Sequence, residues 1–446
     1  MKNFKESGIE WLGEIPEHWE VKKLKMLFTL GNGLNITKAD FVSYGIPCVS
    51  YGEIHSKYPC RLNTTIHTLP FVSKTYLADK PQSLLQKGDF VFVDTSEDIE
   101  GSGNFTSIQS DTPIFAGYHT IILKYKGKIN SLYFSFLFDS IFTRNQIRKE
   151  VCGVKVFSIT KSILKEVQCL IPPLKEQEQI ANFLDEKCKK IANFIEKKEK
   201  LITLLKEQKQ ALINETITKG LDKNINFKDS GIEWLGEIPQ HWEVKKLKML
   251  FTLGNGLNIT KADFVSYGIP CVSYGEIHSK YPCRLNTTIH TLPFVSKTYL
   301  ADKPQSLLQK GDFVFVDTSE DIEGSGNFTS IQSDTPIFAG YHTIILKYKG
   351  KINSLYFSFL FDSIFTRNQI RKEVCGVKVF SITKSILKEV QCLIPPLKEQ
   401  EQIANFLDEK CEKIDLLIEK TKKQIKLIKE YKTTLINQAV CGRINL

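Results

Sequence analysis

The chain has 446 residues, of which 42% are hydrophobic and 25% charged, and its formal net charge is +10. This is the composition of an ordinary folded protein, and the excess of lysine and arginine suits a polyanionic partner without requiring one. No apolar run is long enough for a signal peptide or a membrane span, and the eleven cysteines lack zinc-ligand spacing. We therefore expect a soluble, cytoplasmic protein with reduced thiols.

The sequence contains an internal repeat, in which a globular domain is followed by a long helix. Residues 18–188 are identical to residues 241–411, at a constant offset of 223. The copies differ outside this run; Gln240, for example, replaces Glu17. The expected segments are a first globular domain at 1–172, a long helix at 173–221, a second globular domain at 222–395 and a second long helix at 396–446.

Within one copy, short strands are expected to precede the helices. Alternating or β-rich apolar runs predict strands, at residues 19–24, 48–51, 89–94, 119–125 and 167–171. Residues 130–151 predict one helix, apolar first and basic at its end, where Arg144, Arg148 and Lys149 lie. A further short helix is expected at residues 160–166. The domain is therefore predicted to be mixed α+β, with more strand than helix.

The two long helices carry a coiled-coil pattern. Apolar residues recur at alternating spacings of three and four, and the second helix gives the first a partner of its own kind. Lys198 and Lys209 interrupt the seam, which indicates a particular partner helix. The expected seam residues are Leu184, Ile191, Ile195, Ile202, Leu205, Leu212, Leu407, Ile414, Ile418, Ile425, Ile428 and Leu435.

Motifs for catalysis are missing from the sequence. There is no GxxxxGK[ST] phosphate loop and no HExxH metal motif. A nuclease site using Glu17 and Glu20 is disfavoured, because Gln240 removes the first carboxylate in the second copy. The histidines, among them His18 and His119, are scattered and have no obvious acid partner. We predict no catalytic residue, no metal site and no enzyme activity of the chain itself.

Several loops mix cations with small polar residues and aromatics, which suits phosphate contacts combined with readout of base edges. Solvated loops are the plainer alternative for any one of these residues. The candidates for DNA contact in the first copy are Lys57, Arg61, Lys74, Ser102, Asn104, Tyr118, His119, Arg148 and Lys155. Their counterparts in the second copy are Lys280, Arg284, Lys297, Ser325, Asn327, Tyr341, His342, Arg371 and Lys378.

Three motifs carry a resemblance to a known family. They are SGIEWLGEIPEHWEVKKL from Ser7, PPLKEQEQIANFLDEKC from Pro172 and again from Pro395, and LINQAVCGRINL from Leu435. The chain resembles the specificity subunits of type I restriction–modification systems along essentially its whole length. The resemblance implies two strand-rich target-recognition domains joined by two long helices, which form an antiparallel coiled coil with pseudo-two-fold symmetry.

The resemblance also implies the partners. Each recognition domain would read one half of an interrupted double-stranded DNA site. The helices would act as a spacer and dock adenine methyltransferase subunits, two per chain, through which restriction and translocase subunits join. S-adenosylmethionine and ATP would be bound by those partners, so that no cofactor is expected on this chain.

The identity of the two copies departs from the family, whose members normally carry two different recognition domains. Two identical readers related by a two-fold axis match a DNA site whose halves are inverted copies. We therefore expect an interrupted palindrome. Two alternatives remain: a free-standing bivalent DNA-binding regulator, and a coiled-coil scaffold whose globular ends bind protein.

Overall fold

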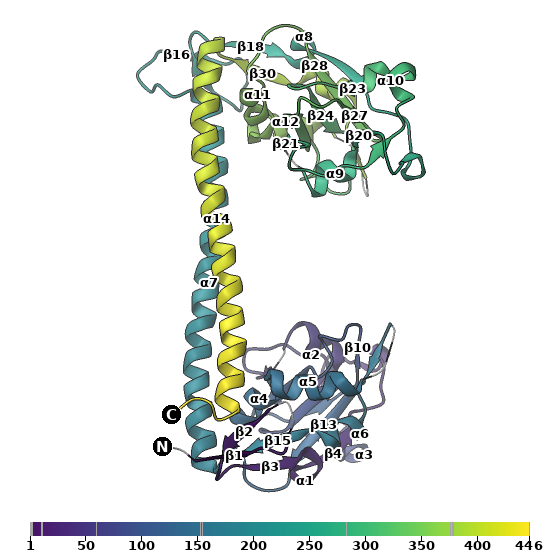
Figure 1. Ribbon diagram of the computed structural model, residues 1–446, viewed down its shortest axis with the longest axis vertical. Helices are drawn as coiled ribbons and strands as arrows, with labels where there is room; N and C mark the ends of the chain where they lie inside the picture. The colour runs from purple at the N-terminus through teal and green to yellow at the C-terminus, as the bar shows by residue number, and fades with distance from the viewer. Residues whose placement is uncertain are drawn as a thin grey trace. The chain divides into compact units, whose positions relative to one another are not determined.

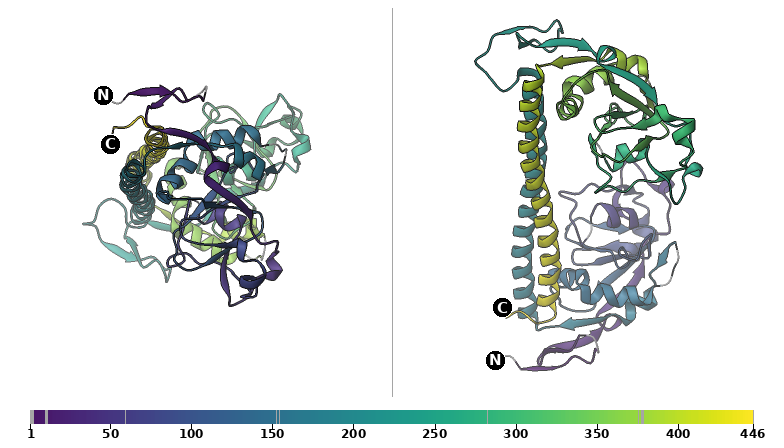
Figure 2. Two further views of the ribbon diagram at one scale, coloured as in Figure 1. Left: turned by 90° about the horizontal axis from the view of Figure 1, so that it is seen from below. Right: turned by 45° about the horizontal axis from the view of Figure 1, so that its top comes forward.

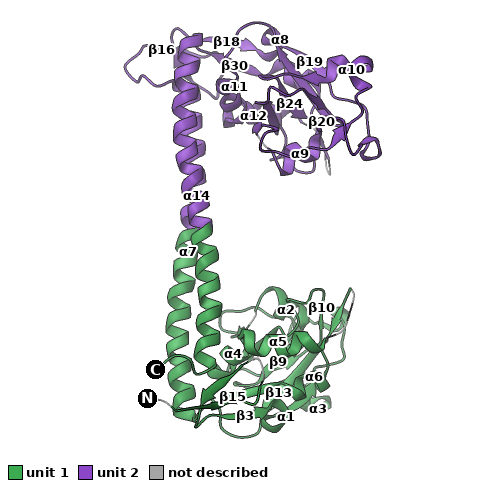
Figure 3. Cartoon of the chain, viewed as in Figure 1, with its two compact units in different colours: residues 1–198, 423–446 green, residues 199–422 purple. Residues whose placement is uncertain are grey.

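The computed structural model describes residues 3–9, 12–58, 60–151, 153, 155–281, 283–374, 376 and 379–445. The chain divides into two compact units, residues 1–198 with 423–446, and residues 199–422 (Figure 3). Helix α7 (Leu174–Lys219) and helix α14 (Leu397–Val440) each contribute to both units. A unit is therefore one globular domain together with parts of both long helices.

The domain of unit 1 is built on two small sheets. A five-stranded sheet has the order β4-β13-β9-β11-β6, and a four-stranded sheet the order β7-β5-β12-β8 (Figure 1). The strands of these sheets are β4 (Phe28–Asn32), β5 (Ile46–Val49), β6 (Cys60–Leu62), β7 (Phe71–Val72), β8 (Leu84–Leu85), β9 (Phe90–Val93), β11 (Phe105–Ile108), β12 (Ile114–Ala116) and β13 (Thr120–Tyr125). Two-stranded pairs join β1 (Phe4–Glu6) to β2 (Glu14–Pro16), β3 (Glu20–Lys23) to β15 (Gln168–Ile171), and β10 (Thr95–Ser96) to β14 (Phe157–Ser158). The helices are α1 (Leu24–Leu27), α2 (Tyr51–Ser56), α3 (Tyr76–Asp79), α4 (Ser131–Asp139), α5 (Ile141–Glu150) and α6 (Lys161–Glu166).

Aromatic side chains fill the core between the five-stranded sheet and α4. Strand β9 is buried along its whole length, and its Phe90 and Phe92 lie against Phe138 of α4 with ring centroids 5.1 and 5.2 Å apart. Phe105 of β11 completes the group, 5.7 Å from Phe138. Edge-to-face packing of this kind adds stabilisation beyond that of burial alone. The core therefore fixes α4 on the sheet.

The single helix expected at residues 130–151 is two helices, so that prediction was wrong. Ser140 is extended (φ −70°, ψ 154°), and its hydroxyl accepts a hydrogen bond from the amide of Thr143. Serine is a preferred N-cap because its side chain satisfies an otherwise unpaired amide in the first turn. The chain therefore bends between α4 and α5, and the bend sets the direction of the arginine-bearing helix α5.

Both units pair α7 with α14 in opposite directions (Figure 1). Unit 1 holds the beginning of α7 and the end of α14, whereas unit 2 holds the end of α7 and the beginning of α14. All twelve expected seam residues are buried or half-buried. In unit 2, Lys209 of α7 places its Nζ 2.6 Å from Asp415 of α14, which gives one of the seam lysines its partner.

The end of each long helix completes the domain of the other repeat. In unit 1, Ile436 and Val440 of α14 join the main core, and Arg443 donates a hydrogen bond to the carbonyl of Leu12 at 2.8 Å. The C-terminal residues therefore lie beside the β1–β2 hairpin (Figure 2). In unit 2, Ile213 and Ile217 of α7 have the same role.

Unit 2 repeats the elements of unit 1 at the constant offset. These elements include α9 (Tyr274–Ser279), β25 (Thr318–Ser319), β26 (Phe328–Ile331), α11 (Ser354–Asp362), α12 (Ile364–Glu373) and α13 (Lys384–Glu389). Its five-stranded sheet has the order β19 (Phe251–Asn255), β28 (Thr343–Tyr348), β24 (Phe313–Val316), β26 (Phe328–Ile331) and β21 (Cys283–Leu285). Its four-stranded sheet has the order β22 (Phe294–Val295), β20 (Ile269–Val272), β27 (Ile337–Ala339) and β23 (Leu307–Leu308). Among the residues that the structure describes, no helix is both long enough and apolar enough to cross a membrane.

Candidate nucleic-acid interface

A cavity of about 870 Å³ lies in unit 1 where helix α2 meets the segments around β10, β13 and β14. It is lined by Tyr51, Gly52, His55, Ser56, Thr95, Ser96, Glu97, Asp98, Glu100, Gly101, Asn104, His119 and Val156. The equivalent residues of unit 2 line a cavity of about 750 Å³. The fold thus brings together the regions around α2, β10, the start of β13 and β14, which are far apart in the sequence.

A chain of polar contacts forms one wall of the cavity in unit 1. Arg144 on α5 pairs with Asp139 at 2.9 Å and donates a second hydrogen bond to Oδ1 of Asn104 at 3.0 Å. The Nδ2 of Asn104 lies 2.8 Å from Nδ1 of His55, whose Nε2 lies 2.9 Å from the carbonyl oxygen of Thr95. Both polar atoms of the Asn104 amide, and both ring nitrogens of His55, are therefore engaged.

The donor at one end of this chain and the acceptor at the other determine the tautomer of the histidine. A guanidinium only donates, so Arg144 requires the oxygen of Asn104 to face it and the NH₂ group to face His55. A carbonyl only accepts, so Nε2 of His55 carries its proton toward Thr95. In this arrangement His55 donates from Nε2 and accepts at Nδ1. The side chains of Asn104 and His55 are therefore held in place by their hydrogen bonds and line the cavity.

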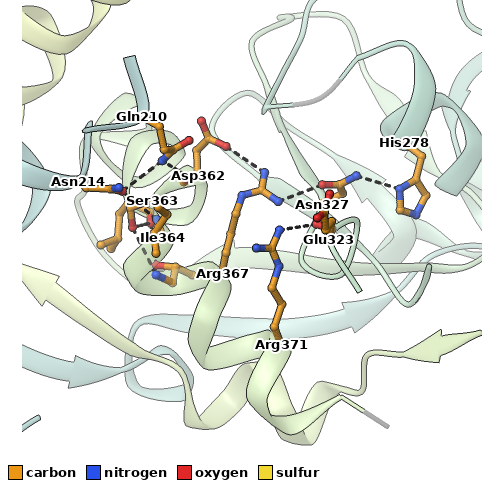
Figure 4. Close-up of polar contacts among 12 residues, drawn as sticks. Gln210, Asn214, His278, Glu323, Asn327, Asp362, Ser363, Ile364, Arg367 and Arg371 are labelled. Atoms are coloured by element: carbon orange, nitrogen blue, oxygen red, sulfur yellow. Dashed lines mark hydrogen bonds and ion pairs between the residues drawn. The ribbon is translucent and has the colours of Figure 1, made fainter. Parts of the chain in front are cut away.

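The same chain occurs in unit 2 (Figure 4). Arg367 contacts Asp362 at 2.9 Å and Asn327 at 3.0 Å, and Asn327 lies 2.9 Å from His278. This arrangement follows from the identical sequences of the two domains.

Arg148 of α5 is also engaged within its own domain. Its Nη2 donates to the backbone carbonyl of Glu100 in the cavity loop. Burial, with repulsion from Arg144, lowers the pKa of the Arg148 guanidinium. Arg371 holds Glu323 in the same way in unit 2, and burial, again with a nearby arginine, lowers its pKa too. Each of these arginines thus connects helix α5 or α12 to the cavity loop of its own domain.

His119 is a polar side chain of the cavity that is both held and exposed. Its φ is +55°, a left-handed conformation that is uncommon for residues other than glycine. Its Nδ1 lies 3.0 Å from Oδ1 of Asp94, its ring lies edge-on to Tyr51 at 5.5 Å, and its side chain remains 57% exposed. Backbone strain at an exposed residue is a feature of functional sites. His342 has the same φ and pairs with Asp317 at 3.0 Å.

Tyr118 packs beside this histidine without lining the cavity. Its ring lies 5.5 Å from that of Tyr51, and burial raises the pKa of its phenol. Tyr341 has the same environment in unit 2, with its pKa raised by burial.

Some of the residues expected to contact DNA lie elsewhere. Ser102 and Ser325 are fully buried, so their hydroxyls lie below the surface, and their contact with DNA stays a prediction. Arg61 pairs with Asp185 of α7 at 2.6 Å and lies over the ring of Phe136. Its counterpart Arg284 makes the equivalent contacts, with Asp408 at 2.6 Å and with Phe359. Both arginines attach their domain to a long helix.

The expected lysines are exposed. Lys57 follows α2 next to the cavity, and Lys155 lies beside the cavity residue Val156. Lys74 covers the ring of Tyr44, itself 75% exposed, at 4.9 Å. In unit 2, Lys280 and Lys297 are exposed as well, whereas Lys378 lies outside the described residues.

Sequence patterns missed the partners of the histidines and the roles of two asparagines. His18 pairs with Glu176 at 2.9 Å and His119 with Asp94, so the expectation that they lack acid partners was wrong. Asn437 and Asn214, on the long helices, contact α5 and α12. No short-range signal marks such pairs. Among the described residues, no group of three or more His, Cys, Asp or Glu side chains is arranged to hold a metal ion.

Comparison with known proteins identifies relatives along the whole chain. Residues 16–206 and 239–427 match the family model described as the type I restriction modification DNA specificity domain. The type I restriction enzyme MjaVIII specificity subunit of Methanocaldococcus jannaschii is 26% identical over 469 aligned residues, which cover 100% of this chain and 96% of that protein. The putative MjaX specificity subunit of the same organism is 27% identical, with 100% and 97% covered.

Two solved structures share the fold. One is a chain from a structural study of complex assembly and conformational transition of the type I R-M system. It superposes with a TM-score of 0.73 at 13% identity, covering 96% of this chain and 99% of that one. The crystal structure of the HsdS subunit from Thermoanaerobacter tengcongensis gives a TM-score of 0.54 at 14% identity, covering 96% and 98%.

Proposed function

The chain belongs to the family of type I restriction–modification specificity subunits, and we propose that it directs its complex to an interrupted palindromic DNA site. Its two target-recognition domains confer DNA sequence specificity, as is general for the family. Because the domains are identical from residue 18 onward to the long helix, each would read the same bases. The proposal concerns the symmetry of the site and the residues that read it.

The equivalence of the two cavities is the observation that carries this proposal. The Arg–Asn–His chain, the strained histidine and the loop-holding arginine recur in both units with the same partners. Each unit attaches to α7 and α14 with the roles of the two helices exchanged. Two identical readers related by a two-fold operation would match inverted half-sites. The long helices would set the number of unread base pairs between them.

Within each unit, the proposed DNA contacts are the exposed histidine of the cavity and the lysines that lie beside the cavity. Lys57 and Lys155 would bind phosphates and supply the salt-dependent share of the affinity. His119 would present its free Nε2 to a base edge, because Asp94 already occupies Nδ1. Lys280 and His342 have the same proposed roles in unit 2. Asn104, Arg61 and Arg148 are left out of this surface because each already makes a hydrogen bond or ion pair within unit 1.

Methyltransferase subunits are the partners that the family implies in general, and we propose two per chain. The long helices of unit 1 expose Phe194 and Leu427, which are 40% and 53% exposed. Those of unit 2 expose the equivalent residues Leu417 and Leu204, which are 50% and 51% exposed. Exposed apolar residues on paired helices suit a protein partner, and one such set in each unit supports two docking sites.

Catalysis is proposed to lie in the partners. Specificity subunits are generally not catalytic, and we propose that this chain has no activity of its own. S-adenosylmethionine would be bound by the methyltransferases, and ATP by restriction subunits that join through them. The complex would act in the cytoplasm.

Mapping of methylated adenines tests the proposal. Genomic DNA from cells that express the chain with its methyltransferase should carry one interrupted motif whose two halves are inverted copies. Cells lacking the chain, but keeping the methyltransferase, are the control and should lack this methylation. Adenines modified in two unlike half-sites would contradict the palindrome while leaving the family role intact.

A further inference from the structure

The segment between β25 and β26 of unit 2 forms one wall of the cavity, and two arginines of α12 hold it. Arg371 donates to the carbonyl of Glu323, and Arg367 donates to the side chain of Asn327 at 3.0 Å (Figure 4). The arginines are four residues apart and so lie on one face of the helix. Together they donate hydrogen bonds to the first and the last residue of the segment 323–327.

These arginines are poorly placed to bind DNA themselves. The side chain of Arg367 is only 14% exposed, and its guanidinium is shared between Asp362 and Asn327. Arg371 is half-buried and is engaged with the loop. A phosphate would have to displace these contacts and leave a partly buried acceptor unpaired, which costs free energy.

The helix that carries the arginines is fixed in turn by α7. Asn214 accepts a hydrogen bond from the amide of Ile364, the first residue of α12, at 2.9 Å. Gln210 donates to the carbonyl of Asp362 at 3.3 Å. A continuous series of polar contacts therefore runs from the long helix, through α12, to the cavity loop and His278 (Figure 4).

We propose that Arg367 and Arg371, and their counterparts Arg144 and Arg148, are positioning residues for sequence readout. They would hold the cavity loop and the histidine behind it in the conformation that fits the recognised bases, without touching DNA. The proposal rests on the proposed function, since it assigns roles within the same recognition cavity. In this role, the four arginines donate hydrogen bonds to groups of the protein rather than to DNA.

Substitution by lysine separates positioning from phosphate binding. Lysine keeps the positive charge but loses the planar fork that reaches two acceptors at once. The affinity of the Arg144→Lys, Arg367→Lys double variant, in complex with the methyltransferase, is measured for the mapped site and for a scrambled duplex over a series of salt concentrations. Lys57→Gln with Lys280→Gln serves as the phosphate-contact control.

A positioning role predicts that the ratio of specific to non-specific affinity falls on the order of tenfold or more, the scale of one lost base contact. The non-specific affinity and its salt slope should stay unchanged. The lysine control should instead weaken binding to both duplexes and reduce the salt slope by about 0.9 per lost phosphate contact. An unchanged ratio, or a parallel loss on both duplexes with a lower slope, would overturn the proposal.

A second variant keeps the test decisive if the arginine variant unfolds. Asn104→Asp with Asn327→Asp retains the oxygen that faces each arginine and removes the NH₂ group that faces each histidine. The same fall in the affinity ratio is expected, with an unchanged thermal midpoint, and an unchanged ratio would again overturn the proposal. If the unsubstituted complex shows no preference between the two duplexes, the proposed function fails instead.

Discussion

The side chain of Asn437, near the end of α14, accepts a hydrogen bond at 3.0 Å from the backbone amide of Phe142, which lies 295 residues earlier in the chain. Asn214 of α7 accepts a similar bond at 2.9 Å from the amide of Ile364, one position earlier in the corresponding helix. Both acceptors satisfy amides in the first turn of a domain helix, which that helix cannot pair by itself. Each recognition domain thus depends on the end of the other repeat's helix.

This dependence predicts crossed effects of substitution. Asn437→Ala should destabilise unit 1 and Asn214→Ala unit 2, each by about 1 kcal/mol, the cost of losing a helix cap. Calorimetry measures the loss as a shift of roughly 2–4 °C in one part of the thermal transition. The double variant serves as the control and should shift both parts of the transition. A shift confined to the same part in both single variants would contradict the crossed arrangement.

The glycines after the two long helices should differ in their tolerance of a side chain. Gly442 and Gly220 both have φ of +73°, so alanine is strained by about 1–2 kcal/mol at either position. A Cβ at Gly442 would also lie 2.5 Å from Cδ of Pro16, whereas at Gly220 the nearest atom, in Trp242, is 3.2 Å away. Gly442→Ala should therefore lower the melting temperature more than Gly220→Ala. Equal losses in thermal unfolding would show that the contact with Pro16 relaxes freely.

How much of this could be read from the sequence depends on the range of each interaction. The heptad pattern is local, and its residues are those buried between α7 and α14. The break at Ser140 was missed because no glycine or proline marks it, only a capping hydroxyl. Ser102 was proposed as a DNA contact from the composition of its loop, but its side chain is buried in the fold.

The candidate site was predictable only in part, for the same reason. His119 and the lysines were proposed from loop composition, and their contact with DNA stays a prediction. The links from Arg144 to Asn104 and from Asn104 to His55 join positions 40 and 49 residues apart, and no periodicity encodes them. The same residue types in a loop can face DNA or face the protein, and only the tertiary contacts distinguish the two. Arg148 illustrates the difference, because its charge suggested a phosphate contact and its hydrogen bond goes to Glu100.

Acid should remove one electrostatic contribution from each unit. Glu166 contacts Lys23 and Lys25, each at 2.6 Å, and hydrogen bonds from these lysines lower its pKa from 4.5 to about 2. Because the folded pKa lies below the unfolded value, the contribution is present above about pH 4.5 and is lost as the pH falls toward about 2. Glu389 has the same pKa, lowered by Lys246 and Lys248.

The matching experiment compares denaturant unfolding of the unsubstituted chain with the Glu166→Gln, Glu389→Gln variant across this pH range. The difference in unfolding free energy should shrink as the pH falls from 4.5, and it should shrink at neutral pH when salt is added, since these carboxylates are exposed. A difference that persists at pH 2 would mean that the glutamates act through packing.

A charge placed in the seam should uncouple recognition from folding. Leu205 and Ile428 are half-buried between the long helices, and glutamate there would leave a charge without a partner in an apolar contact. The double variant should lose methylation of the target site while far-ultraviolet circular dichroism still reports folded domains. Lys206→Glu, at the exposed neighbouring position, is the control and should retain methylation. Retained methylation in the seam variant would count against the helices as a spacer.

Substitutions on the exposed apolar residues of the helices should change the number of bound methyltransferases stepwise. Leu204→Lys with Leu417→Lys alters only unit 2, and Phe194→Lys with Leu427→Lys only unit 1. If each set docks one methyltransferase, either pair of substitutions should leave a complex with one, and all four together should leave the chain without any. Native mass spectrometry counts the subunits directly. Ile66→Lys with Ile289→Lys is the matched control, since both isoleucines are 76% exposed but lie on the recognition domains. A fully loaded complex in the fourfold variant would place the docking surface elsewhere, whereas complete loss from either pair alone would mean that the two partners bind only together.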